Sequence, residues 1–269
     1  MTHDVSRLLK EAALAVREAV ASVPAKERGR EVAMGADGEP TTAVDAAAER
    51  ALISVLERAR FPLTIVSEEA GEIDLVPGSS PVLVLADPVD STTNAIAGLP
   101  FYATALAAYV DGEPQASVVM NLATGDAYEA SRGEGAFLNG WRVRRGGVAL
   151  DQSIIAFGPV REPYVQAILA RLALSAGGVR LFACPSLGVA DVGAGRLGGF
   201  LGLGRKGKVH RLFDVAASAL FAEEAGAVVT DLRGEGLKHD VRDLTGAVTV
   251  VAAPAALHAE LLALIGVEA

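Results

Sequence analysis

The chain has 269 residues, a formal net charge of −9 and 51% apolar residues, a balance that suits a folded globular protein and excludes wholesale disorder. The sequence pI of about 5.0 argues against a nucleic-acid partner, because nucleic-acid binding needs a basic surface. An acidic chain of this kind suits a protein that gathers carboxylates to hold cations.

The sequence favours a cytoplasmic protein without a membrane partner. Residues 1–20 carry charges every few positions, so we expect no signal peptide. The most apolar stretch, residues 246–265, contains Pro254 and Glu260 and lacks the roughly 20 uninterrupted apolar residues of a membrane span. The one cysteine, Cys184, excludes an internal disulfide and favours a reducing compartment.

The first half of the chain predicts two helices and an antiparallel sheet. Apolar residues at helical spacing predict an amphipathic helix over residues 4–23. Residues 24–41 are rich in Gly, Pro and charge and predict a loop or weak hairpin, and residues 42–60 predict a second helix that Pro62 ends. Apolar runs predict strands at 63–67, 81–88, 102–112, 115–130 and 133–144.

After about residue 150 the pattern changes to alternating strands and helices. The predicted strands are 153–160, 179–185, 198–211 (strand or hairpin), 227–232 and 247–253, and the predicted helices are 162–177, 186–196, 213–226 and 254–267. Such alternation indicates α/β layering. We therefore expect an α/β protein with an α+β N-terminal half, residues 1–150, packed closely against an α/β C-terminal half, residues 151–269.

Acidic residues stand where the predicted strands end. Glu68 and Glu69 follow the strand at 63–67, and Asp87 and Asp90 follow the apolar run that begins at 81. Buried strands deliver their C-terminal residues to a shared edge, where α/β proteins place their chemistry. We therefore expect these four carboxylates to meet.

The segment 87–90, Asp-Pro-Val-Asp, is the most specific of these patterns. Pro88 lacks an amide hydrogen and fixes the backbone, so we expect one tight bend to present both carboxylates. Residues 91–93 follow at a predicted helix start, where free N–H groups favour an anion such as phosphate. Carboxylates beside amide donors fit a phosphate ester held against a hard cation such as Mg²⁺.

Each acid also has a simpler explanation. Asp45, Asp90 and Asp214 stand at predicted helix starts, where an acid is most often a cap. Glu68 and Glu69 alone would form a solvated turn. Together, however, clustered carboxylates would repel and raise one another's pKa, so the joint pattern favours a cation site.

Several stretches of the sequence resemble the inositol monophosphatase superfamily of metal-dependent, lithium-sensitive phosphatases. The three signature regions are SEEAG at 67–71, DPVDSTTN at 87–94 and FDVAAS at 213–218, and YEASRGEGAFLNG at 128–140 resembles the family's Gly-rich hairpin. MGADGEPTTAVD at 34–45 and AGLPFYATALA at 97–107 resemble the archaeal-type branch, which hydrolyses both fructose 1,6-bisphosphate and inositol monophosphate. The resemblance covers about residues 30 to 230 and implies a layered αβαβα sandwich of the sugar phosphatase type.

The resemblance also implies a set of metal ligands. Glu68, Asp87 and the carbonyl of Val89 would hold a first Mg²⁺. Asp87, Asp90 and Asp214 would hold a second, and Glu68 could help a third, weaker one. Mn²⁺ could substitute for Mg²⁺, and two such ions would clamp the attacking and leaving oxygens of a displacement at phosphorus.

The catalytic and phosphate-binding residues follow from the same resemblance. Asp45 and Thr92, acting with Glu68, would orient and deprotonate the attacking water. The backbone amides of Ser91 and Thr92 would bind the phosphate of a small phosphorylated metabolite. The resemblance further implies a homodimer. Cys184 need not be a nucleophile, and an inert thiol buried in a predicted strand is the favoured interpretation.

Three positions depart from the family pattern. Ser91 replaces a usual Gly, and it would be strained if φ were positive, but we expect an ordinary helix-start residue. Phe213 stands where Trp is common. Gly207 replaces a Glu that binds sugar hydroxyls in the inositol monophosphatases.

A basic run surrounds Gly207 and bears on the substrate. Its residues are Arg205, Lys206, Lys208, His210 and Arg211. Arg and Lys make strong charge-assisted contacts with phosphate, so Arg205, Lys208 and Arg211 are candidate substrate-binding residues that favour a bisphosphate. A solvated hairpin with basic side chains is the simpler alternative.

Other functions remain open at this point. Residues 193–198 read GAGRLG, the glycine pattern of a dinucleotide-binding loop, but a strand should precede and a helix follow it. A non-catalytic regulatory or RNA-associated protein could share the fold, as could a phosphatase for adenosine 3′,5′-bisphosphate or histidinol phosphate. Residues 34–41 could also form a loop that closes over the metals.

Overall fold

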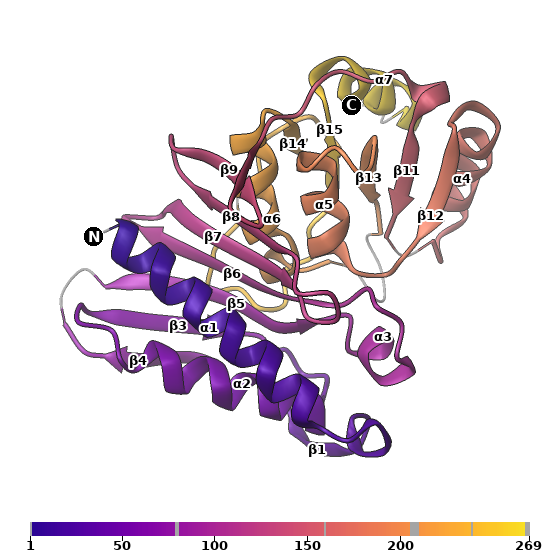
Figure 1. The fold of residues 1–269 in the computed structure, drawn as a ribbon. Helices are drawn as coiled ribbons and strands as arrows, with labels where there is room; N and C mark the ends of the chain where they lie inside the picture. The colour runs from indigo at the N-terminus through magenta and orange to yellow at the C-terminus, as the bar shows by residue number, and fades with distance from the viewer. Residues whose placement is uncertain (1, 79–80, 159, 205–209, 238, 267–269) are drawn as a thin grey trace.

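Helices and sheets alternate in five layers in the computed structural model of the chain (Figure 1). The structure describes residues 2–78, 81–158, 160–204, 210–237 and 239–266. From one side to the other, the layers are helices α1 (Thr2–Ser22) and α2 (Ala43–Leu56), an eight-stranded sheet, helices α5 (Pro185–Gly193) and α6 (Leu212–Ala225), a five-stranded sheet, and helices α4 (Pro163–Ser175) and α7 (Ala255–Ile265). The predicted αβαβα sandwich is confirmed.

The eight-stranded sheet is antiparallel except where β3 and β5 run parallel. Its spatial order is β10 (Trp141–Val143), β9 (Gly135–Leu138), β8 (Ala127–Ser131), β7 (Glu113–Asn121), β6 (Ala103–Val110), β5 (Val82–Asp90), β3 (Leu63–Ser67) and β4 (Gly71–Val76). The parallel pair brings two strand ends to one edge.

The second sheet and the remaining short elements complete the chain. The five-stranded sheet has the order β12 (Gly178–Leu181), β11 (Ile154–Phe157), β13 (Gly199–Gly202), β15 (Val250–Ala253) and β14 (Val228–Thr230). The residues predicted as a weak hairpin form β1 (Glu31–Met34) and β2 (Pro40–Thr42). The short helix α3 (Thr92–Ala97) follows β5, and 3₁₀ turns lie at Ala25–Glu27 and Leu150–Gln152.

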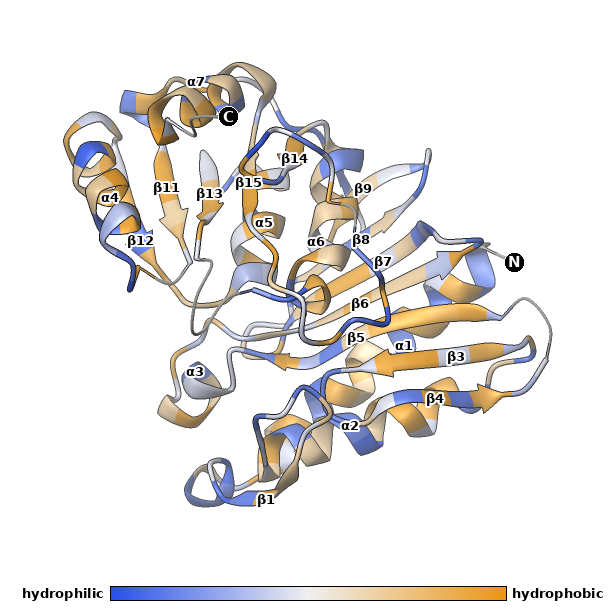
Figure 2. Ribbon diagram, turned by 180° about the vertical axis from the view of Figure 1, so that it is seen from behind, coloured by the Kyte–Doolittle hydropathy of each residue, from blue (hydrophilic) through white to orange (hydrophobic). Residues whose placement is uncertain are grey.

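The middle helices are largely buried because a sheet covers each of their two faces. Every residue of α5 is buried, and so are most residues of α6, as expected for helices between two sheets. Figure 2 shows the apolar colour along the strands of the eight-stranded sheet. Small side chains let the two helices approach closely: a Cβ added at Gly193 would lie 2.8 Å from the Cα of Ala222.

The two halves of the chain share one apolar core. Helices α5 and α6 belong to the second half of the sequence, yet α6 packs on β6 and β7 of the first half, and a single cluster of buried side chains includes residues of both. The close packing expected of the halves is present. The boundary near residue 150 stays a prediction.

The glycine motif at 193–198 does not have the context of a dinucleotide-binding loop. Gly193 ends α5, and β13 begins at Gly199. The order is therefore helix, glycines, strand, whereas the binding loop needs strand, glycines, helix. No described helix is long and apolar enough to cross a membrane.

We predict that Gly193→Ala destabilises the protein by about 1–3 kcal/mol, because the added methyl overpacks the contact between α5 and α6. A destabilising effect would be informative, because Ala normally stabilises a helix interior relative to Gly. The measurement is urea unfolding followed by circular dichroism. Gly147→Ala, where a Cβ would meet no atom within 4 Å, is the control. Equal stability of the Gly193 variant and the wild type would contradict this account of the packing.

Candidate functional site

The parallel strands β3 and β5 bring Glu68 and Asp87 together. Ser67 pairs with Ala86 across the two strands, and the Glu68 amide donates to the Ala86 carbonyl at 3.2 Å. The next residues, Glu68 and Asp87, therefore lie side by side at the carboxyl ends of the strands. Their carboxyl groups share a hydrogen bond.

A β-bulge places Asp90 on the same face of the sheet as Asp87. Asp87 pairs with Ala105 of β6 and Asp90 pairs with Ala103, so three steps along β5 match two along β6. The extra residue cancels the alternation that would send residues three apart to opposite faces. Pro88 lies inside the bulge, a position that tolerates its missing N–H. The predicted tight bend is therefore wrong, because β5 runs through to Asp90 and a bulge presents both carboxylates.

Asp214 reaches the same cluster from the start of α6. It is the third residue of the helix and accepts a hydrogen bond from the Arg211 amide at 2.7 Å. Its carboxyl group also shares a hydrogen bond with that of Asp87. The simpler interpretation of this acid as a cap is thus correct, and it is compatible with a place in the cluster because a carboxylate has two oxygens.

Asp45 and Thr92 form a hydrogen-bonded pair that joins α2 to α3. Thr92 Oγ1 donates to Asp45 Oδ1 at 2.8 Å, while Asp45 Oδ2 accepts from the Thr42 amide at 3.0 Å and from Thr42 Oγ1 at 2.7 Å. Thr92 Oγ1 also lies 3.2 Å from the Val89 carbonyl oxygen. Both oxygens of Asp45 are therefore oriented, and Thr92 connects this acid to the segment that carries Asp90.

Burial and mutual repulsion raise the pKa of the clustered carboxyl groups. The pKa values of Glu68 and Asp87 lie well above the usual range, first because of burial and then because neighbouring carboxylates repel. The same causes raise the pKa of Asp214 to about 8, and burial raises the pKa of Asp90 to about 6. The hydrogen bond from the Arg211 amide opposes the rise in the pKa of Asp214, and the charge of the Arg211 side chain opposes it more weakly. A divalent cation would relieve this repulsion.

The donor set of the cluster suits a hard divalent cation. It consists of carboxylate oxygens, which Mg²⁺ prefers to sulfur or nitrogen donors. Asp87 Oδ1 is buried and has no hydrogen-bond partner among the described residues. Within the same residues, no three His, Cys, Asp or Glu side chains are spaced as around a bound ion. The residues fit the metal by chemistry, burial and the unpaired oxygen.

Ser91 has a left-handed backbone, with φ 73° and ψ 55°. The expectation of an ordinary helix-start residue is therefore wrong. Ser91 is the N-cap of α3, but in a region that costs a non-glycine residue roughly 1–2 kcal/mol. The helix's own hydrogen bonds begin with the Asn94 and Ala95 amides, which donate to the Ser91 carbonyl. The amides of Ser91 and Thr92 precede them, in the position of free N–H groups at a helix start.

The basic run is described only at its end. Arg205 and Lys208 lie outside the described residues. Arg211 Nη1 donates to the Thr245 carbonyl at 2.6 Å. His210 is buried, and burial lowers its pKa to about 4, so it is neutral near pH 7 and adds no positive charge to the run.

Sequence reasoning missed Asp37 as a neighbour of the cluster. The turn between β1 and β2 lies against the end of β3, where the Ala36 amide donates to the Glu69 carbonyl at 3.0 Å and the Asp37 amide donates to the Glu68 carbonyl at 3.2 Å. The charge of Asp37 contributes to the raised pKa of Glu68 and of Asp45. Asp37 lies within residues 34–41, the loop predicted to cover the metals, and an acid in that loop was a usable signal. Closure of the loop stays a prediction.

Two residues at the start of α5 also touch the cluster. Cys184 is buried, and burial raises the pKa of its thiol well above the usual range, in keeping with the inert thiol that the sequence favours. It is the N-cap of α5 rather than part of a strand, which corrects the predicted element. Ser186 was not singled out from the sequence, and both residues contact Asp90.

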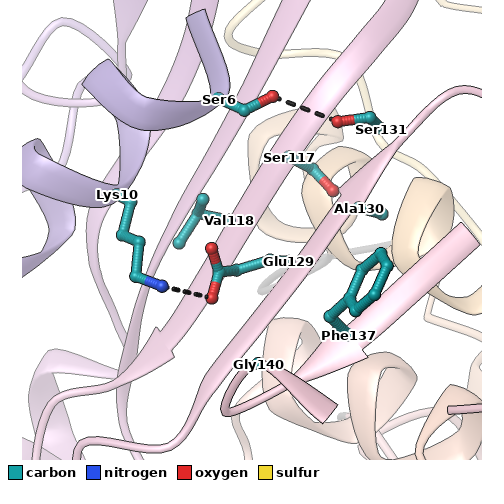
Figure 3. Close-up of a pocket in the computed structure, with 9 residues that line it drawn as sticks. All are labelled: Ser6, Lys10, Ser117, Val118, Glu129, Ala130, Ser131, Phe137 and Gly140. Atoms are coloured by element: carbon teal, nitrogen blue, oxygen red, sulfur yellow. Dashed lines mark hydrogen bonds and ion pairs between the residues drawn. The ribbon is translucent and has the colours of Figure 1, made fainter. Parts of the chain in front are cut away.

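A separate hollow opens on the face of the eight-stranded sheet that points away from the carboxylate cluster (Figure 3). Lys10 Nζ of α1 lies 2.8 Å from Glu129 Oε1 of β8, and Ser6 Oγ lies 3.1 Å from Ser131 Oγ. This is the α1 side of the sheet, whereas Asp87 and Asp90 face the α6 side. The hollow is therefore separate from the carboxylate cluster.

The sequence and structure are similar to those of known phosphatases. A model of the inositol monophosphatase family matches residues 2–266. The fructose-1,6-bisphosphatase/inositol-1-monophosphatase of Archaeoglobus fulgidus is 37% identical over 268 residues, which cover 98% of each chain. The Nus factor SuhB of Escherichia coli is 35% identical over 201 residues, which cover 72% of each chain.

Solved structures give the same result. The crystal structure of an inositol monophosphatase–fructose 1,6-bisphosphatase is 28% identical, with a TM-score of 0.84 over 96% of this chain and 98% of that one. The extragenic suppressor protein SuhB of Bartonella henselae is 26% identical, with a TM-score of 0.84 over 99% of this chain and all of that one. These matches confirm the resemblance read from residues 67–71, 87–94 and 213–218, and the chain belongs to the inositol monophosphatase family of phosphoric monoester hydrolases.

Proposed function

We propose that the chain is a Mg²⁺-dependent phosphomonoesterase for small sugar and polyol phosphates, in particular fructose 1,6-bisphosphate and inositol 1-phosphate. The observation that carries the proposal is the convergence of carboxyl groups from β3, β5 and α6 in one buried cluster. The dual-specificity relative from Archaeoglobus fulgidus supports this substrate class.

The carboxylates and one carbonyl would divide between two principal cations. Glu68, Asp87 and the Val89 carbonyl would hold the first Mg²⁺. Asp87, Asp90 and Asp214 would hold the second, and Glu68 would help with a weaker third. Mn²⁺ would substitute for Mg²⁺. When bound, the ions would neutralise phosphate oxygens and lower the pKa of water.

Asp45 and Thr92 would handle the proton of the attacking water. Thr92 Oγ1 donates its hydrogen to Asp45 Oδ1, so its lone pairs are free to accept a hydrogen bond from the water. Burial raises the pKa of Asp45, which makes it a stronger base than a solvated aspartate. As the water oxygen bonds to phosphorus and the bond from phosphorus to the ester oxygen breaks, one water proton would pass to Thr92 Oγ1 while the Thr92 hydroxyl proton passes to Asp45. The leaving oxygen would take a proton from solvent and depart as the alcohol. The amides of Ser91 and Thr92 would bind the phosphate.

The basic run would bind the second phosphate of a bisphosphate. Arg205, Lys208 and Arg211 are the candidates, since a phosphate dianion is matched by charge-assisted hydrogen bonds. Adenosine 3′,5′-bisphosphate and histidinol phosphate could use the same metal site, because fold and metal site do not fix the leaving group.

A regulatory role without catalysis is the second candidate, and the SuhB relatives named as Nus factors are the observation in its favour. The presence of all the expected acids together with Thr92 favours catalysis. A cytoplasmic homodimer remains part of this proposal, on the strength of the family resemblance and of the single cysteine.

A substrate panel tests the proposed specificity. With saturating Mg²⁺, we expect the double variant Arg205→Ala/Lys208→Ala to lose about 10- to 100-fold in kcat/KM for fructose 1,6-bisphosphate, the value of one or two charged hydrogen bonds. The loss for inositol 1-phosphate should stay within about threefold, since this substrate has no second phosphate for the contacts to serve. Adenosine 3′,5′-bisphosphate completes the panel. Equal losses of kcat/KM on fructose 1,6-bisphosphate and inositol 1-phosphate would reject the second-phosphate role.

Asp87→Asn tests the metal centre. We expect kcat to fall at least about 10³-fold on every substrate, roughly 4 kcal/mol of transition-state stabilisation, because the shared ligand is lost. In EDTA its melting temperature should equal or exceed that of the wild type, since one charge leaves a crowded cluster. Glu260→Gln, which neutralises an exposed acid on α7, is the matched control and should retain wild-type activity. Retained activity in the Asp87 variant would contradict the proposal.

A further inference from the structure

Segment 182–186 of the second half of the chain is bonded directly to the motif that carries Asp90. Asp90 Oδ2 accepts hydrogen bonds from the Ser186 amide at 2.8 Å, from Ser186 Oγ and from Cys184 Sγ at 3.1 Å. Four residues further on, Asn94 Nδ2 donates to the Phe182 carbonyl at 2.7 Å. The contacts are buried, with Ser186 fully enclosed and Asp90 only 5% exposed.

The three donors all converge on one oxygen of Asp90. Cys184 and Ser186 lie at the start of α5, and each reaches Oδ2. Three hydrogen bonds to one oxygen fix the rotation of the carboxylate, and hydrogen bonds to a charged acceptor are the strong ones. These bonds all go to Oδ2, so Oδ1 is the oxygen of Asp90 that a cation would meet.

The backbone at Ala183 is shaped to make these contacts. Ala183 has φ of 57°, a conformation that costs a non-glycine residue roughly 1–2 kcal/mol. Such strain persists only where surrounding contacts over-determine it. Here the carbonyl of Phe182 faces Asn94 on one side of Ala183, the donors of Cys184 and Ser186 face Asp90 on the other, and the Phe182 ring packs on Phe101 with centroids 4.1 Å apart.

We propose that Ser186, assisted by Cys184, is a positioning residue that orients Asp90 toward the second divalent cation and so ties the C-terminal half of the chain to the metal centre. The inference rests on the proposed function, because it needs a cation at Asp90. Hydrogen bonds from outside the ligand set that orient a ligating group commonly change metal affinity 10- to 100-fold. Neither residue touches the reacting atoms; each acts through Asp90.

The test is Mn²⁺ binding, followed by the electron paramagnetic resonance signal of the free ion. Ser186→Ala keeps the backbone donor but loses the hydroxyl, and we expect the affinity of the second Mn²⁺ site, the one that Asp90 would hold, to fall about 10-fold. The Mn²⁺ concentration for half-maximal activity should rise in step, with kcat at saturating metal changed less. Ser218→Ala is the matched control: Ser218 is buried on α6, and its hydroxyl donates to the Val215 carbonyl of the same helix at 3.0 Å.

A second pair of variants keeps the proposal testable if Ser186→Ala does not fold. Cys184→Ser retains a donor to Asp90 and should bind Mn²⁺ like the wild type, whereas Cys184→Ala should bind the ion more weakly. Wild-type Mn²⁺ affinity in Ser186→Ala or Cys184→Ala, even with a lower melting temperature, would show a merely structural role and overturn the proposal. Failure of the wild type itself to bind Mn²⁺ would overturn the proposed function as well.

Discussion

The arrangement of this protein depends on keeping several carboxylates together at a site where little of their surface meets water. Asp87 is 2% exposed and Asp90 5% exposed, and repulsion among the acids adds to the cost of burying them. A fold that keeps such a cluster must supply either protons or cations. The chain meets this constraint with an all-oxygen donor set, the kind that hard divalent cations prefer.

Three local devices bring the acids together. A parallel strand pair in an otherwise antiparallel sheet sets Glu68 beside Asp87, a bulge turns Asp90 to the face of Asp87, and the start of α6 delivers Asp214. The third device also has a structural role, since Asp214 caps α6, as Asp45 caps α2. The mostly apolar helix α6 carries this acid in its first turn, while most of its other residues are buried between the two sheets. Stability and site are therefore built from the same residues.

The order of elements and the identity of the clustered acids could be predicted from the sequence, because periodicity and strand-end positions are local signals. The backbone conformation of residues 87–90 could not be predicted, because Pro next to two acids favours a turn as readily as a bulge. Only the pairing with β6 decides between the two. The positive φ of Ser91 differs from the ordinary helix-start conformation expected from the sequence, although a serine at a usual glycine position was a usable signal. Asp37 and Ser186 were missed because their contacts to the cluster come from distant segments of the chain.

The central claim is that these acids are held for a divalent cation, and thermal unfolding with and without Mg²⁺ tests it most directly. Raised native pKa values, about 6 for Asp90 and about 8 for Asp214, mean that the native state binds more protons than the unfolded chain between about pH 4 and pH 8, so stability without metal falls as pH rises through that window. In EDTA the melting temperature should therefore drop from pH 5.5 to pH 8. Saturating Mg²⁺ should raise it at pH 8 by roughly 5 to 10 °C and by less at pH 5.5. A melting temperature that ignores Mg²⁺ at pH 8 would contradict the account.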